Sequence, residues 1–104
     1  MTTSFLNPSQ IEHFNEFGFL PPVRILATDE AISLRAQVED FEARHPELAG
    51  QLDFKANLIL PAVDRLSRDE RLLNLMEDLL GPNLLHWNST FRIKESNTGQ
   101  HAAW

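Results

Sequence analysis

The sequence predicts an α+β fold that is rich in helix and has one clear strand, near residues 84–94. Segments with apolar residues at spacings of three and four begin at capping residues and end at glycine or proline, as amphipathic helices do. The stretch LLHWNSTFRIK instead alternates between polar and apolar residues, which is the period of a strand. No repeat or low-complexity tract interrupts the 104 residues, and this length fits one domain.

The first helix is predicted from its two ends. Asn7 can cap it, Pro8 suits a first turn, Gln10 can close a capping box and Gly18 can take the left-handed position after the last turn. Its inward residues are expected to be Ile11, Phe14 and Phe17. The following segment, residues 18–26, is predicted to be extended because two adjacent prolines exclude a central strand.

The second helix is predicted to begin at Thr28 and to end at Pro46. Its core face follows the helical spacing through Ala31, Leu34, Val38 and Phe41. Residues 45–57 are expected to form a loop. A short helix is predicted within residues 57–66, with Pro61 in or near its first turn.

The last helix has the clearest signals at its ends. Ser67 and Glu70 are predicted to form a capping box, and Gly81 with Pro82 should stop the helix. We expect it to run over residues 68–80. The residues predicted to be buried are Leu72, Leu75, Met76 and Leu79.

The predicted strand has two different faces. One face carries His86, Asn88, Thr90, Arg92 and Lys94, and the other carries Trp87, Ser89, Phe91 and Ile93. Trp87 and Phe91 are expected to pack in the core because they lie on the apolar face. The polar face is expected to line one wall of a pocket.

Composition excludes several classes of protein. The net charge of −6 and the scattered basic residues argue against a protein that binds a nucleic-acid backbone, which needs clustered positive charge. Apolar runs are too short for a membrane helix, and the first residues do not resemble a signal peptide. The absence of cysteine suits a reducing cytoplasm. We therefore expect a cytoplasmic protein with neither nucleic acid nor membrane as a partner, and small-molecule or protein partners remain.

Histidines are the natural first candidates for catalysis or metal binding. His13 lies in a charged helix face, and His45 with Glu47 follows a helix end without a third ligand to complete a facial triad. His86 and His101 lie on or near the polar face of the predicted strand. No nucleophile triad, phosphate-binding loop or zinc spacing is present, so the sequence predicts no catalytic and no metal-ligating residue.

A resemblance extends this interpretation. The chain carries TDEAISLRAQVEDF and, further on, KANLILPAVDRLSRDERLLNLMEDLLGPNLLHWNSTFRIKESN. These stretches resemble the N-terminal half of the phytanoyl-CoA dioxygenase family, and EDLLGPNLLHWNSTFRIK is the most specific part. Members are non-haem Fe(II), 2-oxoglutarate-dependent oxygenases with a double-stranded β-helix, or jelly roll, preceded by helices. The resemblance covers nearly the whole chain.

The resemblance implies that residues 1–104 form a single incomplete domain, the N-terminal part of an oxygenase domain that stops just before a His-x-Asp metal motif. The full-length enzyme would use Fe(II) and 2-oxoglutarate to hydroxylate a small organic substrate, and this chain alone would be inactive. The residues expected to contact the cosubstrate are Lys55, Asn88, Thr90 and Arg92.

Other interpretations of these residues and of the chain stay open. Lys55 could be a solvated loop residue, Asn88 and Thr90 could make cross-strand hydrogen bonds, and Arg92 could pair with the acidic helices. The alternative function is a stand-alone helical binding module or a degenerate, non-catalytic paralogue.

Overall fold

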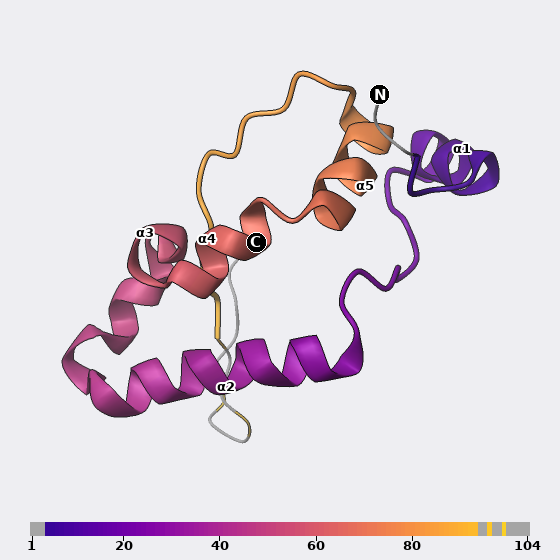
Figure 1. Ribbon diagram of the computed structural model, residues 1–104. Helices are drawn as coiled ribbons and strands as arrows, with labels where there is room; N and C mark the ends of the chain where they lie inside the picture. Colours follow the sequence, from indigo (N-terminus) through magenta and orange to yellow (C-terminus); the bar gives the residue numbers. More distant parts are fainter. Residues whose placement is uncertain (1–3, 94–95, 97–98, 100–104) are drawn as a thin grey trace.

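The protein, described by a computed structural model over residues 4–93, 96 and 99, is built from helices (Figure 1). Residues 18–27 form a long irregular connection between the first two helices, and the later helices are joined by short turns. The last helix is followed by an extended segment, residues 82–93, that runs back along the helices. In chain order the helices are α1 (Pro8–Phe17), α2 (Thr28–Arg44), the 3-10 helix η1 (Pro46–Asp53), α3 (Ala56–Ile59), α4 (Pro61–Ser67) and α5 (Glu70–Leu80).

A small apolar core joins the end of α2 to η1, α3 and α4. Its buried members are Phe41, Leu52, Ala56, Leu60 and Val63. Three further side chains, Val38, Ile59 and Phe91, pack against this cluster while remaining partly exposed. The core therefore includes a residue from the extended segment, far along the chain from the helices that it contacts.

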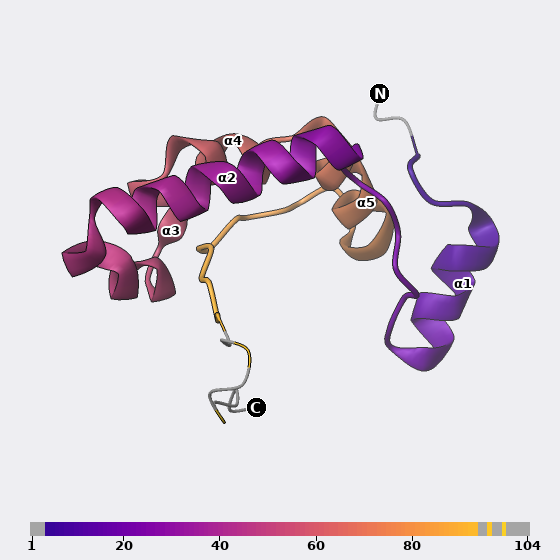
Figure 2. The same ribbon diagram turned by 90° about the horizontal axis from the view of Figure 1, so that it is seen from below.

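Helix α1 lies to one side of the other helices in both views (Figures 1 and 2). None of its residues is buried. The segment before it is held by α5, where the Asp78 carboxylate accepts hydrogen bonds of 2.7 Å from the backbone N–H groups of Phe5 and Leu6. Ser4 donates to the same carboxylate at 3.3 Å, and Leu6 is almost fully buried. These hydrogen bonds lower the pKa of Asp78.

The chain is more open than a compact domain of its length. Its radius of gyration is 16.0 Å, against about 13 Å for a compact domain of about 100 residues. Large apolar side chains are correspondingly exposed, among them Leu85 at 85% and Trp87 at 83%. None of the helices in the described part of the chain has the length and apolar character needed to cross a membrane.

Several of the predicted helix ends are confirmed. Asn7 and Gln10 form the capping box of α1, and Gly18 adopts a left-handed conformation with φ of 78° after it. Pro61 occupies the first turn of α4, and Gly81 follows the last residue of α5. In each case the signal is local, because the backbone groups at a helix end are satisfied by residues within one turn.

The predicted strand near residues 84–94 is wrong for the part of it that the structure describes. Residues 82–93 are extended but belong to no sheet, and no strand occurs among residues 4–93, so the described chain is all-α rather than α+β. A strand needs a neighbouring strand to complete its ladder. Here the neighbours are helical: Ala56 N–H donates to Ser89 O at 2.7 Å, and Phe91 N–H donates to Leu52 O at 3.0 Å. The expected part of a jelly roll is therefore not found in these residues.

The predicted start of the last helix is also wrong. Asp69 caps α5 by accepting a hydrogen bond from Arg71 N–H at 2.9 Å, and the helix begins at Glu70. Ser67 instead closes α4, where its hydroxyl donates to the backbone carbonyl of Asp64 at 2.6 Å. Ser67 and Asp69 can both act as N-cap residues. Asp69 is favoured because its negative charge is also stabilised by the positive end of the helix dipole.

Three further expectations need correction. The predicted loop over residues 45–57 contains η1 and the beginning of α3. Phe17, expected inside, is 57% exposed, and Trp87, expected in the core, is mostly exposed as well. On α5 only Leu75 of the four predicted core residues is buried, because the extended segment covers that helix face incompletely.

A cluster of charges ties the first turn of α2 to the first turn of α5. The Arg71 guanidinium donates to both carboxylate oxygens of Glu30, at 2.8 and 2.7 Å, and to Asp69 at 2.7 and 2.9 Å. Glu30 also accepts from the backbone N–H of Ala27 at 3.0 Å. The pKa values of Glu30 and Asp69 are lowered to about 2, mainly by the hydrogen bonds that Arg71 donates to their carboxylates.

This cluster predicts a loss of stability in acid. The folded pKa values of about 2 lie below the ordinary values of 4.5 for Glu30 and 3.8 for Asp69. The stabilisation is therefore complete above those ordinary values and is lost as pH falls toward 2. Arg71→Met should flatten the dependence of the free energy of unfolding on pH between about pH 4.5 and 2, measured by urea denaturation. Arg35→Met, at an exposed ion pair with Glu39, is the control and should leave the slope unchanged. An unchanged slope in Arg71→Met would contradict the assignment.

The anchor at Asp78 predicts local protection of the N-terminal segment. In Asp78→Ala the amides of Phe5 and Leu6 lose their acceptor, and their hydrogen exchange should accelerate roughly tenfold, equivalent to about 1.4 kcal/mol. The matched control is Asp40→Ala, which removes an exposed carboxylate on α2 and should leave both amides unchanged. Equal protection in Asp78→Ala, measured by NMR, would show that these amides are held by something else.

Candidate functional site

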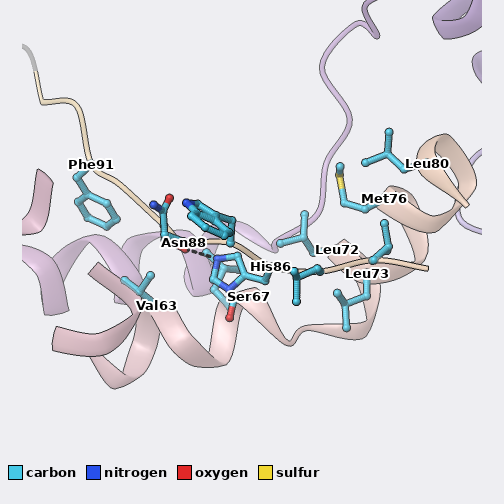
Figure 3. A pocket seen from close by; sticks show the side chains of 14 residues that line it. Val63, Ser67, Leu72, Leu73, Met76, Leu80, His86, Asn88 and Phe91 are labelled. Carbon is cyan, nitrogen blue, oxygen red and sulfur yellow. Dashed lines mark hydrogen bonds between the residues drawn. The ribbon is translucent and has the colours of Figure 1, made fainter. Parts of the chain in front are cut away.

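An apolar groove lies between α4, α5 and the extended segment, and it encloses about 420 Å³ (Figure 3). This volume falls in the range typical of small-molecule sites. Its lining residues are Val63, Leu66, Ser67, Leu72, Leu73, Met76, Leu80, Leu84, Leu85, His86, Trp87, Asn88, Ser89 and Phe91. None of these residues is Asp, Glu, Lys or Arg, although 23% of the chain is charged.

The first wall of the groove comes from the amphipathic pattern of α5. Its lining residues, Leu72, Leu73, Met76 and Leu80, recur at spacings that place them on neighbouring turns of one face. Gly81 then ends the helix with φ of 89°, a conformation that disfavours residues with a Cβ atom. The chain leaves the helix at this point, and residues 84–89 together with Phe91 form the opposite wall of the groove.

The opposite wall is fixed where it meets the core. Ser89 uses both backbone groups there: its carbonyl accepts from Ala56 N–H, and its N–H donates to the side-chain oxygen of Asn57 at 3.1 Å. Phe91 donates to the Leu52 carbonyl and packs on the core cluster. A further hydrogen bond, of 2.9 Å, joins the His86 Nε2 atom to the Ser89 hydroxyl.

The predicted alternation of this segment holds over part of its length. Phe91 is half-buried against the core while its neighbours Thr90 and Arg92 are exposed. Ser89 is also half-buried, and its backbone bonds to Ala56 and Asn57, but Trp87, on the same predicted face, projects largely into solvent. The alternation is therefore enforced only where the backbone is bound to η1 and α3. Lys94 lies outside the described residues.

The structure places the four predicted cosubstrate residues in different surroundings. Asn88 is half-buried and lines the groove. Thr90, Arg92 and Lys55 are exposed and do not line it. Within the described chain no ion-pair partner is found for either cation, so the structural salt bridge considered for Arg92 is not formed there. The role of these residues toward 2-oxoglutarate stays a prediction.

The described residues do not fit an iron site. Among them, no three His, Asp or Glu side chains lie close enough together to hold a metal ion. The His45 ring packs against Phe41 in a tilted arrangement, with ring centroids 5.2 Å apart, and its Nδ1 atom lies 3.6 Å from Glu47 Oε1. His13 packs between Phe17 and Phe19, and His101 lies outside the described residues.

Lys55 has a backbone feature that the sequence did not indicate. It is the N-cap residue of α3 and has the left-handed conformation, with φ of 48° and ψ of 52°. Among the described residues it is the one residue other than glycine with positive φ. Lysine at this position carries a conformational cost, and neither Gly nor Asn is present to signal the turn. The turn sets the direction of α3, whose first residue bonds to Ser89.

Comparisons of the chain with protein-family models, with curated proteins and with solved structures found no match. The resemblance to the phytanoyl-CoA dioxygenase family therefore depends only on the sequence stretches that carry it.

The conformation of Lys55 predicts an unusual effect of glycine. Lys55→Gly should leave the free energy of unfolding equal or raise it by up to about 1 kcal/mol, because glycine removes the left-handed penalty. The control is Ala36→Gly on the exposed face of α2, which should cost about 1 kcal/mol. Urea denaturation measures both. A loss in Lys55→Gly as large as that of the control would mean that the lysine side chain, rather than the backbone, matters at this turn.

Proposed function

We propose that this chain is the helical N-terminal part of an Fe(II)/2-oxoglutarate-dependent dioxygenase that oxidises a small organic substrate. The observation that supports the proposal concerns residues 77–94, the part of the chain that most specifically resembles the dioxygenase family. The described part of this stretch contributes the end of α5, the Gly81 turn and the extended wall of the groove. The residues of the resemblance thus form one continuous structural unit beside an apolar groove.

The exposed cations support a role in binding a dianion. Arg92 and Lys55 have no ion-pair partner among the described residues, so neither would lose an internal salt bridge when it binds a carboxylate. Charge-assisted hydrogen bonds of this kind are among the stronger contacts a protein makes to a carboxylate. Thr90, exposed between Phe91 and Ser89, would add a hydroxyl donor from the same segment.

The open architecture supports a catalytic centre that includes further polypeptide. The core is small, and Leu85 and Trp87 are among many large apolar side chains left exposed. Exposed apolar surface of this extent in a folded protein commonly marks an interaction site. In the proposal, the iron ligands come from polypeptide that packs beside this chain. The enzyme acts in the cytoplasm, with neither nucleic acid nor membrane as its partner.

A second candidate function is a stand-alone helical binding module or a non-catalytic paralogue. It is favoured by the apolar groove together with the lack of any metal-ligand trio among the described residues. The coding sequence beyond codon 104 separates the two candidates. An open frame that encodes a His-x-Asp motif supports the oxygenase, and a stop codon supports the module.

The oxygenase proposal makes a prediction for the complete enzyme. Arg92→Ala and Lys55→Ala should each raise the KM for 2-oxoglutarate roughly ten- to a hundredfold, because a charge-assisted hydrogen bond to the keto acid is lost. Iron affinity should stay nearly unchanged. Succinate formation coupled to oxygen uptake measures the first quantity, and anaerobic iron titration measures the second.

Two control variants test the assignment of the faces. Arg44→Ala removes an exposed arginine paired with Asp40 on α2 and should not change the KM. Phe91→Ala removes a half-buried side chain from the core and should lower stability by about 2 kcal/mol without a selective effect on the cosubstrate. The face assignment is wrong if Phe91→Ala selectively weakens 2-oxoglutarate binding while Arg92→Ala only destabilises the fold.

A further inference from the structure

We propose that the groove between α4, α5 and the extended segment binds an uncharged, largely apolar small molecule that carries one hydrogen-bonding group near its middle. This inference goes beyond the oxygenase proposal because it concerns the groove alone and needs neither iron nor 2-oxoglutarate. It depends on the volume of the groove, on the charge of its lining and on the position of its polar side chains.

The lack of charged side chains in the groove favours an uncharged ligand. No carboxylate, ammonium or guanidinium group belongs to it, whereas the neighbouring helix faces carry ion pairs such as Arg68 with Asp64. A charged ligand would lose hydration in the groove without gaining an opposite charge. An uncharged ligand has no such cost and gains from burial of its apolar surface against the leucines of α5.

The position of the polar side chains in the groove indicates where a bound ligand would carry its hydrogen-bonding group. In Figure 3 the side chains of His86, Ser67 and Asn88 are seen between the α5 residues on one side and Phe91 with Val63 on the other. A ligand lying along the groove would therefore meet apolar surface at both ends and polar groups between them. A carbonyl or hydroxyl in the middle of the molecule matches this order, and a terminal carboxylate does not.

The test uses 5-nonanone, which has a central carbonyl and no charge, against nonanoate, which has a similar chain length and a terminal charge. The intact 104-residue chain is titrated with each at pH 8, and amide and indole NMR shifts are followed. We expect saturable shifts at Trp87 and Ser89, and an affinity for the ketone about tenfold above that for nonanoate.

Substitutions in the groove locate the site. Leu73→Ser and Leu85→Ser should each weaken ketone binding about fivefold, because each removes apolar contact surface. Leu58→Ser on α3, 74% exposed and outside the groove, is the matched control and should bind normally. Leu85 is itself so exposed that its replacement should not disturb folding, so the test stands even if Leu73→Ser unfolds.

Several results would overturn the proposal. Non-saturable shifts, or equal losses in Leu58→Ser and Leu85→Ser, would show general adsorption to apolar surface. Equal affinity for nonanoate would contradict the argument from charge. Shifts at Trp87 that follow protein concentration, without added ketone, would show that a second copy of the chain covers the groove instead.

Discussion

The arrangement of the groove depends on the attachment of residues 89–91 to the η1–α3 turn. Ser89 and Phe91 exchange backbone and side-chain hydrogen bonds with Leu52, Ala56 and Asn57, and the Phe91 ring covers the core. Without this attachment, residues 82–93 would be an unsupported strip leaving α5. One donor, Ala56 N–H, and two acceptors, Leu52 O and the Asn57 side-chain oxygen, are free to bond because helical bonding is incomplete at the turn between η1 and α3. The left-handed Lys55 lies inside that turn, so a strained residue helps to position the far wall of the groove.

Charge holds the remaining helices where apolar contact is sparse. Arg71 connects α5 to α2 through Glu30, and Asp78 connects α5 to the segment before α1. Each connection consists of several short hydrogen bonds between groups that are distant in sequence. Exposed ion pairs within α2, such as Arg35 with Glu39, add little to the stability of the fold. Helix α5 is therefore fixed at its beginning and near its end by polar contacts. Its apolar face is left to line the groove instead of filling a core.

What the sequence could predict follows from the range of each interaction. The capping box of Asn7 and Gln10, the proline of α4 and the glycine after α5 act within one turn, and all were predictable. The Arg71–Glu30 contact joins residues 41 apart, and no local pattern indicates it. The prediction of a strand was wrong for a related reason. Alternation describes which side chains share a surface, and Phe91 obeys it, but it does not say whether the backbone on either side is a strand or a helical turn. For the candidate site, the sequence predicts Asn88 on a pocket wall, and Asn88 lines the groove. Of the α5 residues on the facing wall, Leu72 and Met76 were expected in the core, and no role was predicted for Leu73 or Leu80.

The same open packing underlies both the candidate site and its chemistry. A helix with a strong apolar face is normally stabilised by burying that face, yet on α5 only Leu75 is buried. The unburied leucines gain stability from any apolar contact, which makes the groove receptive, and the missing charges make it selective against ions. Arg92 and Lys55 project outside it. The apolar groove is thus separate from the two cations proposed to bind a carboxylate, Arg92 on the extended segment and Lys55 before α3. If a keto acid binds at the cations, its charge need not enter the apolar groove, and a neutral molecule could occupy the groove at the same time.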